Sequence, residues 1–497
     1  MVKYNQDTWH EVRKYENTLS IIFTLACKRV LGCKTKIFIE HSINKGLYTK
    51  IDIDKSDLQD DRVKLKEEIK NIIKENLKIK KVKISKKETI DIFEKQLMED
   101  KVLLFKTLKR DFFELYKIDN YYFNINGPVE ETSGKIRKFD LKLENSGLVL
   151  IYPRKDTMEK IPRYVKQNKL LNVFKESENW AELIGLKHVG DLNTHIKNGE
   201  IEDIIRVNEA LHEKKIGQIA DEICSKESKI ILIAGPSSSG KTTFSHRLGV
   251  QLRVNGKKFH TIGLDDYFVE RYLTPIDEEG NKNYDTIDAL DIKLFNEDLK
   301  NLLKGEEVVI PTYNFKTGKR SFDKKPIKVD KNEYLIIEGI HGLNDRLTED
   351  IDKKDKYRIY ISALTQLNVD NHNRVSTTDL RFLRRMIRDS KYRGYDAEKT
   401  LELWNNVRKG EEKYIFPFQE NADIMFNSSL IYEIALLKKH AVKLLREVND
   451  KGKYGYEKQR LLRFLDFFTE FNDDSIIPNT SIIKEFIGGS CFRERTL

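Results

Sequence analysis

The residues with the clearest chemistry lie in the stretch KIILIAGPSSSGKTTFSHRLG, residues 229 to 249. Within it, residues 235 to 242 fit the pattern G-x-x-x-x-G-K-[ST], in which a Gly-rich loop joins a strand to a helix. The backbone N–H groups of such a loop and the positive end of the following helix converge on an anion. A chance match in a chain of this length has odds of roughly 1 in 80, before the preceding apolar strand is required. The motif therefore predicts a nucleoside triphosphate site.

Individual positions of the motif have expected roles. Lys241 is expected to meet the β and γ phosphates, and the Thr242 hydroxyl is expected to hold Mg²⁺. The predicted nucleotide-binding residues of the loop and helix are Gly235, Ser237, Ser238, Ser239, Gly240, Lys241, Thr242 and Thr243. The motif alone leaves kinase, GTPase, ATPase and motor functions open.

Acidic residues follow two further predicted strands. Asp265 and Asp266 come directly after an apolar stretch at 258–263, and Glu338 ends another at 334–338. In open α/β sheets, ligands bind beyond the carboxyl ends of the strands, so these carboxylates are expected beside the phosphate. Phosphoryl transfer to a hydroxyl uses one acidic group near Mg²⁺ and another that accepts the proton. No NKxD signature of a GTPase follows in this segment.

Arginines recur at helical spacing further along the chain. In DLRFLRRMIRDSKYRG, Arg381, Arg384, Arg385 and Arg388 are separated by three, four and seven residues, so they share one face. Such a face is compatible with solvent exposure or with recognition of acidic protein or RNA. Behind a phosphate-binding sheet, we favour a lid whose arginines close on the transferring phosphate and exclude water.

The composition of the chain limits its class. Its 497 residues, 39% hydrophobic and 34% charged, suffice for two or three domains with sizeable cores. No apolar run reaches the ~18 residues of a membrane span, and the first residues lack the apolar core of a signal peptide. Four cysteines without a C-x-x-C pair favour a reducing compartment. We therefore expect a cytoplasmic location and no membrane partner.

The formal charge of +10 is a weak indication of nucleic acid binding, because 90 basic residues are opposed by 80 acidic ones. The densest basic run, Lys64 to Lys87, holds ten lysines and three glutamates. Leu65, Ile69, Ile72, Ile73 and Leu77 recur within it at helical spacing. An amphipathic helix with a solvated lysine face explains its first part better than a nucleic-acid surface.

The order of predicted elements indicates an α/β fold, a parallel sheet flanked by helices, preceded by a separate α+β domain. The first region, to about residue 155, mixes helices with strands at 36–39 and 148–152. A polar helical connector fills 156–225. The predicted strands of the nucleotide-binding domain, 226–450, are 230–234, 258–263, 334–338, 357–362 and 423–426. A helical extension, 451–497, contains QRLLRFLDFFTEF and ends near IPNTSIIKEFIGGS.

Six motifs between about 229 and 430 resemble the uridine kinase and phosphoribulokinase family of P-loop kinases. They are GPSSSGKTT, LDDYF, NYDTIDALD, IPTYNFKTGKR, LIIEGIHGLN and RRMIRDSKYRG, and they occur in the family's order. The resemblance implies ATP and Mg²⁺ as cofactors and a nucleoside as acceptor.

The same resemblance assigns roles to individual residues. Asp265 would take the proton from the ribose 5′-hydroxyl, Asp288 would hold the ribose hydroxyls, and Tyr313 would lie near the base. Glu338 would assist Thr242 at Mg²⁺, while Arg388 and Arg393 match lid positions that contact phosphates. Structural alternatives exist: a helix cap for Asp265, a turn residue for Asp288 and simple packing for Tyr313.

Two departures from the family concern the acceptor. Uridine and cytidine kinases carry a histidine that reads the pyrimidine where this chain has Gly318, and an arginine where it has Tyr395. Pyrimidine specificity therefore does not follow from the resemblance.

The N-terminal region resembles a second family, through NTLSIIFTLACKRVLGCKTKIFIEHSINKGLYTKIDI and GPVEETSGKIRKFDLKLENSG. It looks like the second additional, or editing, domain of threonyl-tRNA synthetase. Positions that hold that family's His and Cys ligands here read Asn17, Ile21, Ile125 and Val129. Aliphatic side chains bind no metal and Asn lacks the imidazole nitrogen, so we expect an editing-like fold without editing activity.

The sequence thus predicts an ATP-dependent nucleoside kinase that forms a nucleoside 5′-monophosphate. Two alternatives stay open: a kinase of another sugar-like alcohol, and an ATP-switched protein that holds tRNA or other RNA. The oligomeric state is also open.

Overall fold

The computed structural model describes residues 6–43, 45–53, 58–154, 160–226, 228–277 and 280–492, and the side chains from residue 10 onward. The described chain forms two compact units that alternate along the sequence. The first comprises residues 1–202, 365–376 and 434–472, and the second comprises 203–364, 377–433 and 473–497. The expected consecutive boundaries at 155, 225 and 450 stay a prediction, and residues 155–159 lie outside the described residues.

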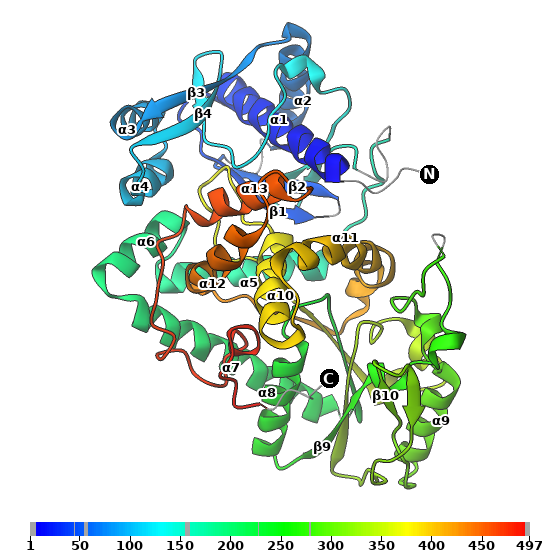
Figure 1. Cartoon of the computed structure of the whole chain (residues 1–497). Coiled ribbons are helices and arrows are strands. Elements are labelled where there is room, and N and C mark those ends of the chain that lie inside the picture. The colour runs from blue at the N-terminus through cyan, green and yellow to red at the C-terminus, as the bar shows by residue number, and fades with distance from the viewer. Residues whose placement is uncertain are drawn as a thin grey trace. The chain divides into compact units, whose positions relative to one another are not determined.

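The first unit contains two antiparallel sheets, with strand orders β1-β2-β7-β6 and β3-β4-β5. Its strands are β1 (Ile37–Ile43), β2 (Gly46–Ile51), β3 (Ile79–Ser85), β4 (Phe112–Ile118), β5 (Tyr121–Phe123), β6 (Asp140–Glu144) and β7 (Gly147–Ile151). Its helices are α1 (Gln6–Leu31), α2 (Leu58–Glu75), α3 (Lys86–Lys95), α4 (Glu99–Thr107), α5 (Asn168–Ile184), α6 (Val189–Asn198), α12 (Glu433–Glu447) and α13 (Gly455–Leu465). The separate α+β region predicted before the nucleotide-binding domain is present (Figure 1).

Three of the four positions that the sequence comparison singled out, Ile21, Ile125 and Val129, lie in or against the apolar core of the first unit. Ile21 on α1 is fully buried, and Ile125 and Val129 pack against the same apolar cluster. The Asn17 side-chain amide donates to the Pro128 carbonyl oxygen at 2.9 Å.

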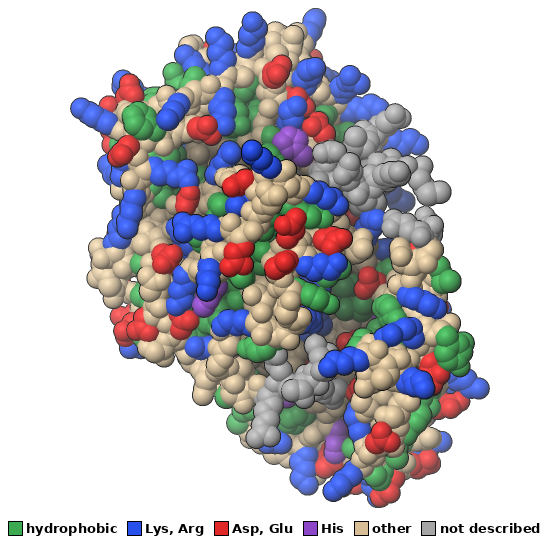
Figure 2. Space-filling view, viewed as in Figure 1, with side chains coloured by type: hydrophobic (Ala, Val, Ile, Leu, Met, Phe, Trp, Pro, Cys, Tyr) green, Lys and Arg blue, Asp and Glu red, His purple; other side chains and the backbone are tan. Residues whose placement is uncertain are grey.

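The first part of the basic run, up to Glu75, forms an amphipathic helix, as its spacing predicted, and the rest enters β3 and the start of α3. Helix α2 buries Leu65, Ile69 and Ile72, whereas Leu77 lies beyond its end. Several of its lysines have acidic partners: Lys66 lies 2.7 Å from Asp140. Over the upper part of Figure 2, Asp and Glu side chains lie among the numerous Lys and Arg side chains. The lysine face therefore carries less net charge than its lysines alone would give.

The second unit is built on a five-stranded parallel sheet with the order β14-β13-β8-β12-β9. Its strands are β8 (Ile230–Ala234), β9 (Lys258–Gly263), β12 (Glu333–Glu338), β13 (Lys356–Ser362) and β14 (Ile424–Asn427), with a separate hairpin of β10 (Thr312–Asn314) and β11 (Lys319–Ser321). Its helices are α7 (Ile201–Lys226), α8 (Lys241–Val254), α9 (Ile292–Leu303), α10 (Thr377–Arg388), α11 (Ala397–Tyr414) and α14 (Lys484–Ile487). The five predicted strands are confirmed within one residue at each end.

Hydrophobicity explains why β8 is central. Every residue from Ile230 to Ala234 is buried, as expected for a strand covered on both faces of a parallel sheet. Its neighbours β12 and β13 run parallel to it, and β9 lies beyond β12. The carboxyl ends of these strands therefore meet at one edge, which is where the predicted carboxylates should lie.

Two further observations concern the helices. The predicted helix in QRLLRFLDFFTEF corresponds to α13, which ends at Leu465, before the apolar residues that follow it. None of the helices within the described ranges has a stretch that is long and apolar enough to cross a membrane.

Candidate active site

The predicted Gly-rich loop connects β8 to α8 in the second unit. A Cβ at Gly235 would collide with the Ile361 carbonyl oxygen, so the close approach of the two strands requires glycine there. Ser238 and Gly240 adopt positive φ angles of 59° and 83°, which bend the loop around the start of α8. The first turn of α8 carries Lys241, Thr242 and Thr243, whose backbone N–H groups have no acceptor within the helix, an arrangement that favours an anion.

Strand register brings the predicted metal-binding residues together. Glu338 pairs with Ile233 of β8 on one side and with Gly263 of β9 on the other. Its Oε1 atom lies 3.5 Å from the Thr242 hydroxyl oxygen. A carboxylate and a hydroxyl side by side offer the hard oxygen donors that Mg²⁺ prefers, so these residues fit the ion that the family implies.

Charged groups surround Lys241. Its ammonium group donates to the carbonyl oxygens of Gly235 at 2.9 Å and Pro236 at 3.1 Å. Burial lowers its pKa and Arg388 lowers it further, whereas the charges of Glu338, Glu485 and Asp265 raise it. Two of the predicted catalytic residues, Asp265 and Arg388, thus act electrostatically on the third.

The two aspartates that follow β9 have different environments. Asp265 is exposed at the sheet edge, in the short turn Leu264–Tyr267. Asp266 is buried, and its Oδ2 lies 2.8 Å from the Lys324 ammonium nitrogen. Exposure leaves Asp265 accessible to an acceptor, while the ion pair gives Asp266 a structural role.

The predicted acceptor residues are less closely grouped. Asp288 is exposed, and its hydrogen bond with Arg346, at 2.7 Å, is the main cause of its lowered pKa. Tyr313 is buried, and its ring centroid lies 5.5 Å from that of Phe268 and 5.1 Å from that of Phe315. Tyr313 therefore belongs to an aromatic cluster directly after the Asp265 turn.

Gly318 lies in the loop of the β10–β11 hairpin with a φ of 70°. A Cβ there would lie 2.6 Å from Arg271 side-chain atoms. The Arg271 guanidinium donates to the Phe315 carbonyl oxygen in the same loop. A cationic side chain therefore occupies the space in which a larger residue at Gly318 would have to fit.

The arginine face of α10 turns toward the Gly-rich loop. Arg381 and Arg384 are only 1% and 0% exposed, and they donate to the carbonyl oxygens of Ser237 at 3.1 Å and Ser238 at 3.3 Å. Arg385 donates to the Ser237 hydroxyl at 2.8 Å. The shared face is confirmed, but Arg381 and Arg384 are not part of an open lid, because buried carboxylates hold them.

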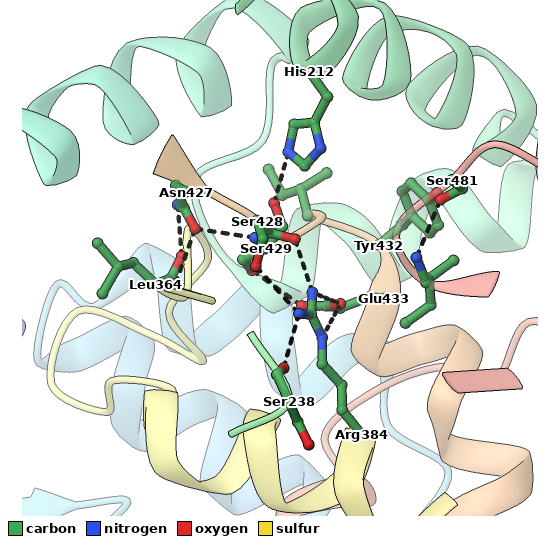
Figure 3. Close-up of polar contacts among 12 residues, drawn as sticks. His212, Ser238, Leu364, Arg384, Asn427, Ser428, Ser429, Tyr432, Glu433 and Ser481 are labelled. Atoms are coloured by element: carbon green, nitrogen blue, oxygen red, sulfur yellow. Dashed lines mark hydrogen bonds and ion pairs between the residues drawn. The ribbon is translucent and has the colours of Figure 1, made fainter. Parts of the chain in front are cut away.

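Figure 3 shows the arrangement around Arg384. Its guanidinium lies 2.6 Å from Glu433 and also donates to the Ser428 carbonyl oxygen at 2.8 Å. Arg381 pairs in the same way with Glu411, which also accepts the Ser237 backbone N–H at 3.0 Å. The two ion pairs therefore hold the backbone of the Gly-rich loop at Ser237 and Ser238.

The remaining predicted lid residues lie at the end of α10. Arg388 Nη1 lies 3.2 Å from Glu485, and Arg393 Nη1 lies 3.1 Å from Asp389. Tyr395, which stands where uridine kinases have an arginine, is 40% exposed. Arg388 is therefore the predicted lid residue that the structure relates directly to Lys241.

Three acidic residues at the site had no assigned role in the sequence analysis. Glu411 and Glu485 lie outside the six family motifs, and their contacts with the loop join segments far apart in the chain. Asp285 lies in NYDTIDALD. Burial raises its pKa, and the negative charges of Glu411 and Asp265 raise it further. Asp285 lies close enough to Asp265 for their charges to interact. The spacing of NYDTIDALD alone does not show which of its aspartates, Asp285 or Asp288, faces the site.

Two buried histidines make the second unit sensitive to acid. Burial lowers the pKa of His341 from 6.5 to about 4, and burial with the nearby Arg247 and Arg384 lowers that of His212 to about 3. Both histidines are neutral when folded at pH 6, whereas in the unfolded chain they bind protons below pH 6.5. Their stabilising contribution is therefore complete above pH 6.5 and is lost as the pH falls toward 4.

We expect the unfolding free energy of this unit to fall by about 1.2 kcal/mol for each histidine between pH 6 and pH 5. His341→Gln should remove its share of that slope. Urea unfolding of the wild-type and His341→Gln proteins at pH 7, 6 and 5 measures the difference. Parallel pH profiles for the two proteins would contradict the pKa assigned to His341.

The fold and this site together define a P-loop kinase domain. The sequence model of the Phosphoribulokinase / Uridine kinase family matches residues 230–435. Uridine kinase from Staphylococcus epidermidis is 33% identical over 201 residues, which cover 40% of this chain and 87% of the relative. The chain belongs to the phosphoribulokinase and uridine kinase family.

Other relatives agree with this placement. Uridine kinase from Staphylococcus haemolyticus is 31% identical over 197 residues, covering 39% of this chain and 86% of the relative. Uridine kinase from Staphylococcus aureus is 31% identical over 204 residues, covering 40% and 87%. These matches concern the kinase domain, and the remainder of the chain lies outside them.

Proposed function

We propose that the second unit transfers the γ-phosphate of ATP to the 5′-hydroxyl of a nucleoside. The observation that carries the proposal is the meeting of three strand ends: the Gly-rich loop after β8, Asp265 after β9, and Glu338 at the end of β12. The uridine kinase relatives support a nucleoside as the acceptor. ATP would bind through residues 235–243 and Arg393.

In the proposed reaction, Asp265 accepts the proton of the acceptor hydroxyl. The acceptor oxygen forms a bond to the γ-phosphorus, the bond from that phosphorus to the β,γ-bridging oxygen breaks, and ADP leaves. Lys241 and Arg388 stabilise the charge on the transferring group. Thr242 and Glu338 would hold Mg²⁺, which would neutralise charge on the phosphates. Asp288 orients the sugar and Tyr313 borders the base.

This proposal is tested by measuring ADP release from the protein with ATP, Mg²⁺ and each member of a panel of ribonucleosides and deoxyribonucleosides. We expect one or a few nucleosides to stimulate release, with a product heavier by one phosphate. A protein that binds ATP but responds to no nucleoside would contradict the proposed acceptor.

A kinase of another sugar-like alcohol is the second candidate. It is favoured by the loop of the β10–β11 hairpin, where Arg271 lies against Gly318 in place of a larger residue. A guanidinium presents only hydrogen-bond donors, so an acceptor that reached Arg271 would have to offer it oxygen or anionic groups. Sugar alcohols and sugar phosphates belong in the same assay panel for this reason.

For the first unit, an inactive domain of the threonyl-tRNA synthetase editing type stays a prediction, as does a cytoplasmic location. The placement of Ile21, Ile125 and Val129 in or against the apolar core of this unit is compatible with that prediction. An RNA-binding function would instead show tRNA affinity that falls steeply with salt, and ATP turnover indifferent to nucleosides.

A further inference from the structure

The C-terminal segment, residues 473–492, belongs to the second unit, and its middle part lies beside the Gly-rich loop, where Ile482 faces Gly240. The Ser481 hydroxyl donates to Glu209 of α7, and Ile482 and Ile483 are fully buried. A Cβ on Gly240 would lie 2.5 Å from the Ile482 side chain. In Figure 1 this segment, coloured red, lies beside α8 and α10. Its packing therefore brings α14 to the start of α8.

One carboxylate of this segment contacts the predicted phosphate-binding groups. Glu485 is 6% exposed, and its Oε2 accepts the Thr243 hydroxyl at 2.9 Å and the Thr243 backbone N–H at 3.4 Å. Its Oε1 accepts from Arg388 Nη1 at 3.2 Å. The carboxylate thus bridges the first turn of α8 and the end of α10.

These donors can serve only one anion at a time. The Thr243 hydroxyl has a single proton to donate, and the N–H groups of a helix start point at the site where a phosphate would bind. A phosphate in contact with Thr243 would also meet the negative charge of Glu485 at close range. Like charges at such a distance repel strongly where water is excluded.

We propose that Glu485 is an internal competitor of the nucleotide, a carboxylate that occupies the phosphate donors of Thr243 and Arg388 until ATP displaces it. This inference rests on the proposed function, because it takes Thr243 and Arg388 to be nucleotide contacts. The displaced group is small. Ile482, Ile483 and Phe486 are fully buried, so they hold the segment in place while the Glu485 side chain turns away.

Competition has a measurable consequence for affinity. Removing the charge of Glu485 should strengthen nucleotide binding, since the phosphates no longer displace an anion. It should also lower the stability of the nucleotide-free protein, since Arg388 loses its ion pair with Glu485. A residue that only positions Thr243 and Arg388 for the nucleotide would give the opposite sign for affinity, because its loss would disorder both.

ADP binding to the full chain, measured by titration calorimetry with Mg²⁺, tests the inference. We expect Glu485→Gln to lower the Kd for ADP by about tenfold and to lower the melting temperature without nucleotide. Glu485→Asp keeps the charge but withdraws it by one methylene, so it should give a smaller gain in affinity. Asp473→Asn removes one negative charge from the same segment, away from Thr243 and Arg388, and should leave the Kd unchanged.

An unchanged or higher Kd in both Glu485 variants, with ADP still bound by the wild-type protein, would overturn the inference and leave the kinase proposal standing. Failure of the wild-type protein and of both variants to bind ADP would overturn the proposed function and the inference with it. Should Glu485→Gln not fold, Glu485→Asp alone decides between the two signs.

Discussion

Asp265→Asn is expected to lower the turnover of the acceptor by a factor of about 10² to 10⁴ while ATP binding is retained. The amide cannot accept a proton, yet it has nearly the same shape and leaves the Gly-rich loop untouched. Asp265 is exposed at the end of β9, so its substitution opens no cavity. Single-turnover ADP formation and ADP affinity, measured on the same preparation, separate the chemical step from binding.

Glu270→Gln is the matched control for this experiment. It removes one negative charge from the same connecting segment, five residues after Asp265 and beyond the sheet edge. We expect turnover within about twofold of the wild-type value, because Glu270 is only half-buried and solvent screens the effect of its charge over distance. Wild-type turnover in Asp265→Asn would refute its assignment as the base, and attention would then move to Asp285.

Arg384→Met is expected to destabilise the second unit by about 3 to 5 kcal/mol, since it leaves the buried carboxylate of Glu433 without its partner. The substitution also removes hydrogen bonds to the carbonyl oxygens of Ser238 and Ser428. Amide hydrogen exchange in the buried strand β8 reports on this unit separately from the other, which a single unfolding transition would not.

The double variant Arg384→Met/Glu433→Gln distinguishes charge from packing. Because it removes both charges, we expect it to recover part of the lost protection in β8. The single variant Glu433→Gln should be milder than Arg384→Met, since Arg384 keeps its hydrogen bonds to Ser238 and Ser428. Equal protection in Arg384→Met and wild-type protein would show that the pair does not stabilise the loop.

Local patterns predicted much of the second unit. The strands of its sheet are apolar runs bounded by turns, and the loop after β8 has a spacing that only a phosphate site explains well. The parallel arrangement of the strands explains how residues far apart in sequence meet, because parallel strands place their carboxyl ends at one edge of the sheet. This rule placed Glu338 at the sheet edge, and the family resemblance paired it with Thr242, 96 residues away, from which it lies 3.5 Å.

Long-range partners could not be predicted in this way. The spacing of Arg381 and Arg384 gave a shared face but not its burial, which depends on Glu411 and Glu433 from other elements. Likewise, nothing in the sequence near Glu485 indicates a contact with Thr243. Side chains that meet through tertiary packing carry no local periodicity, so only the folded chain reveals them.

The interleaving of the two units has a consequence for biosynthesis. Residues 365–376 and 434–472 complete the first unit, and Asp370 in the former segment pairs at 2.5 Å with the fully buried Lys101. A ribosome that has finished residue 202 must therefore add about 270 residues more before that unit has all its parts, which takes roughly 15 to 55 s. During this interval the nascent N-terminal region exposes a surface that a chaperone could recognise, while most of the kinase sheet is already being made.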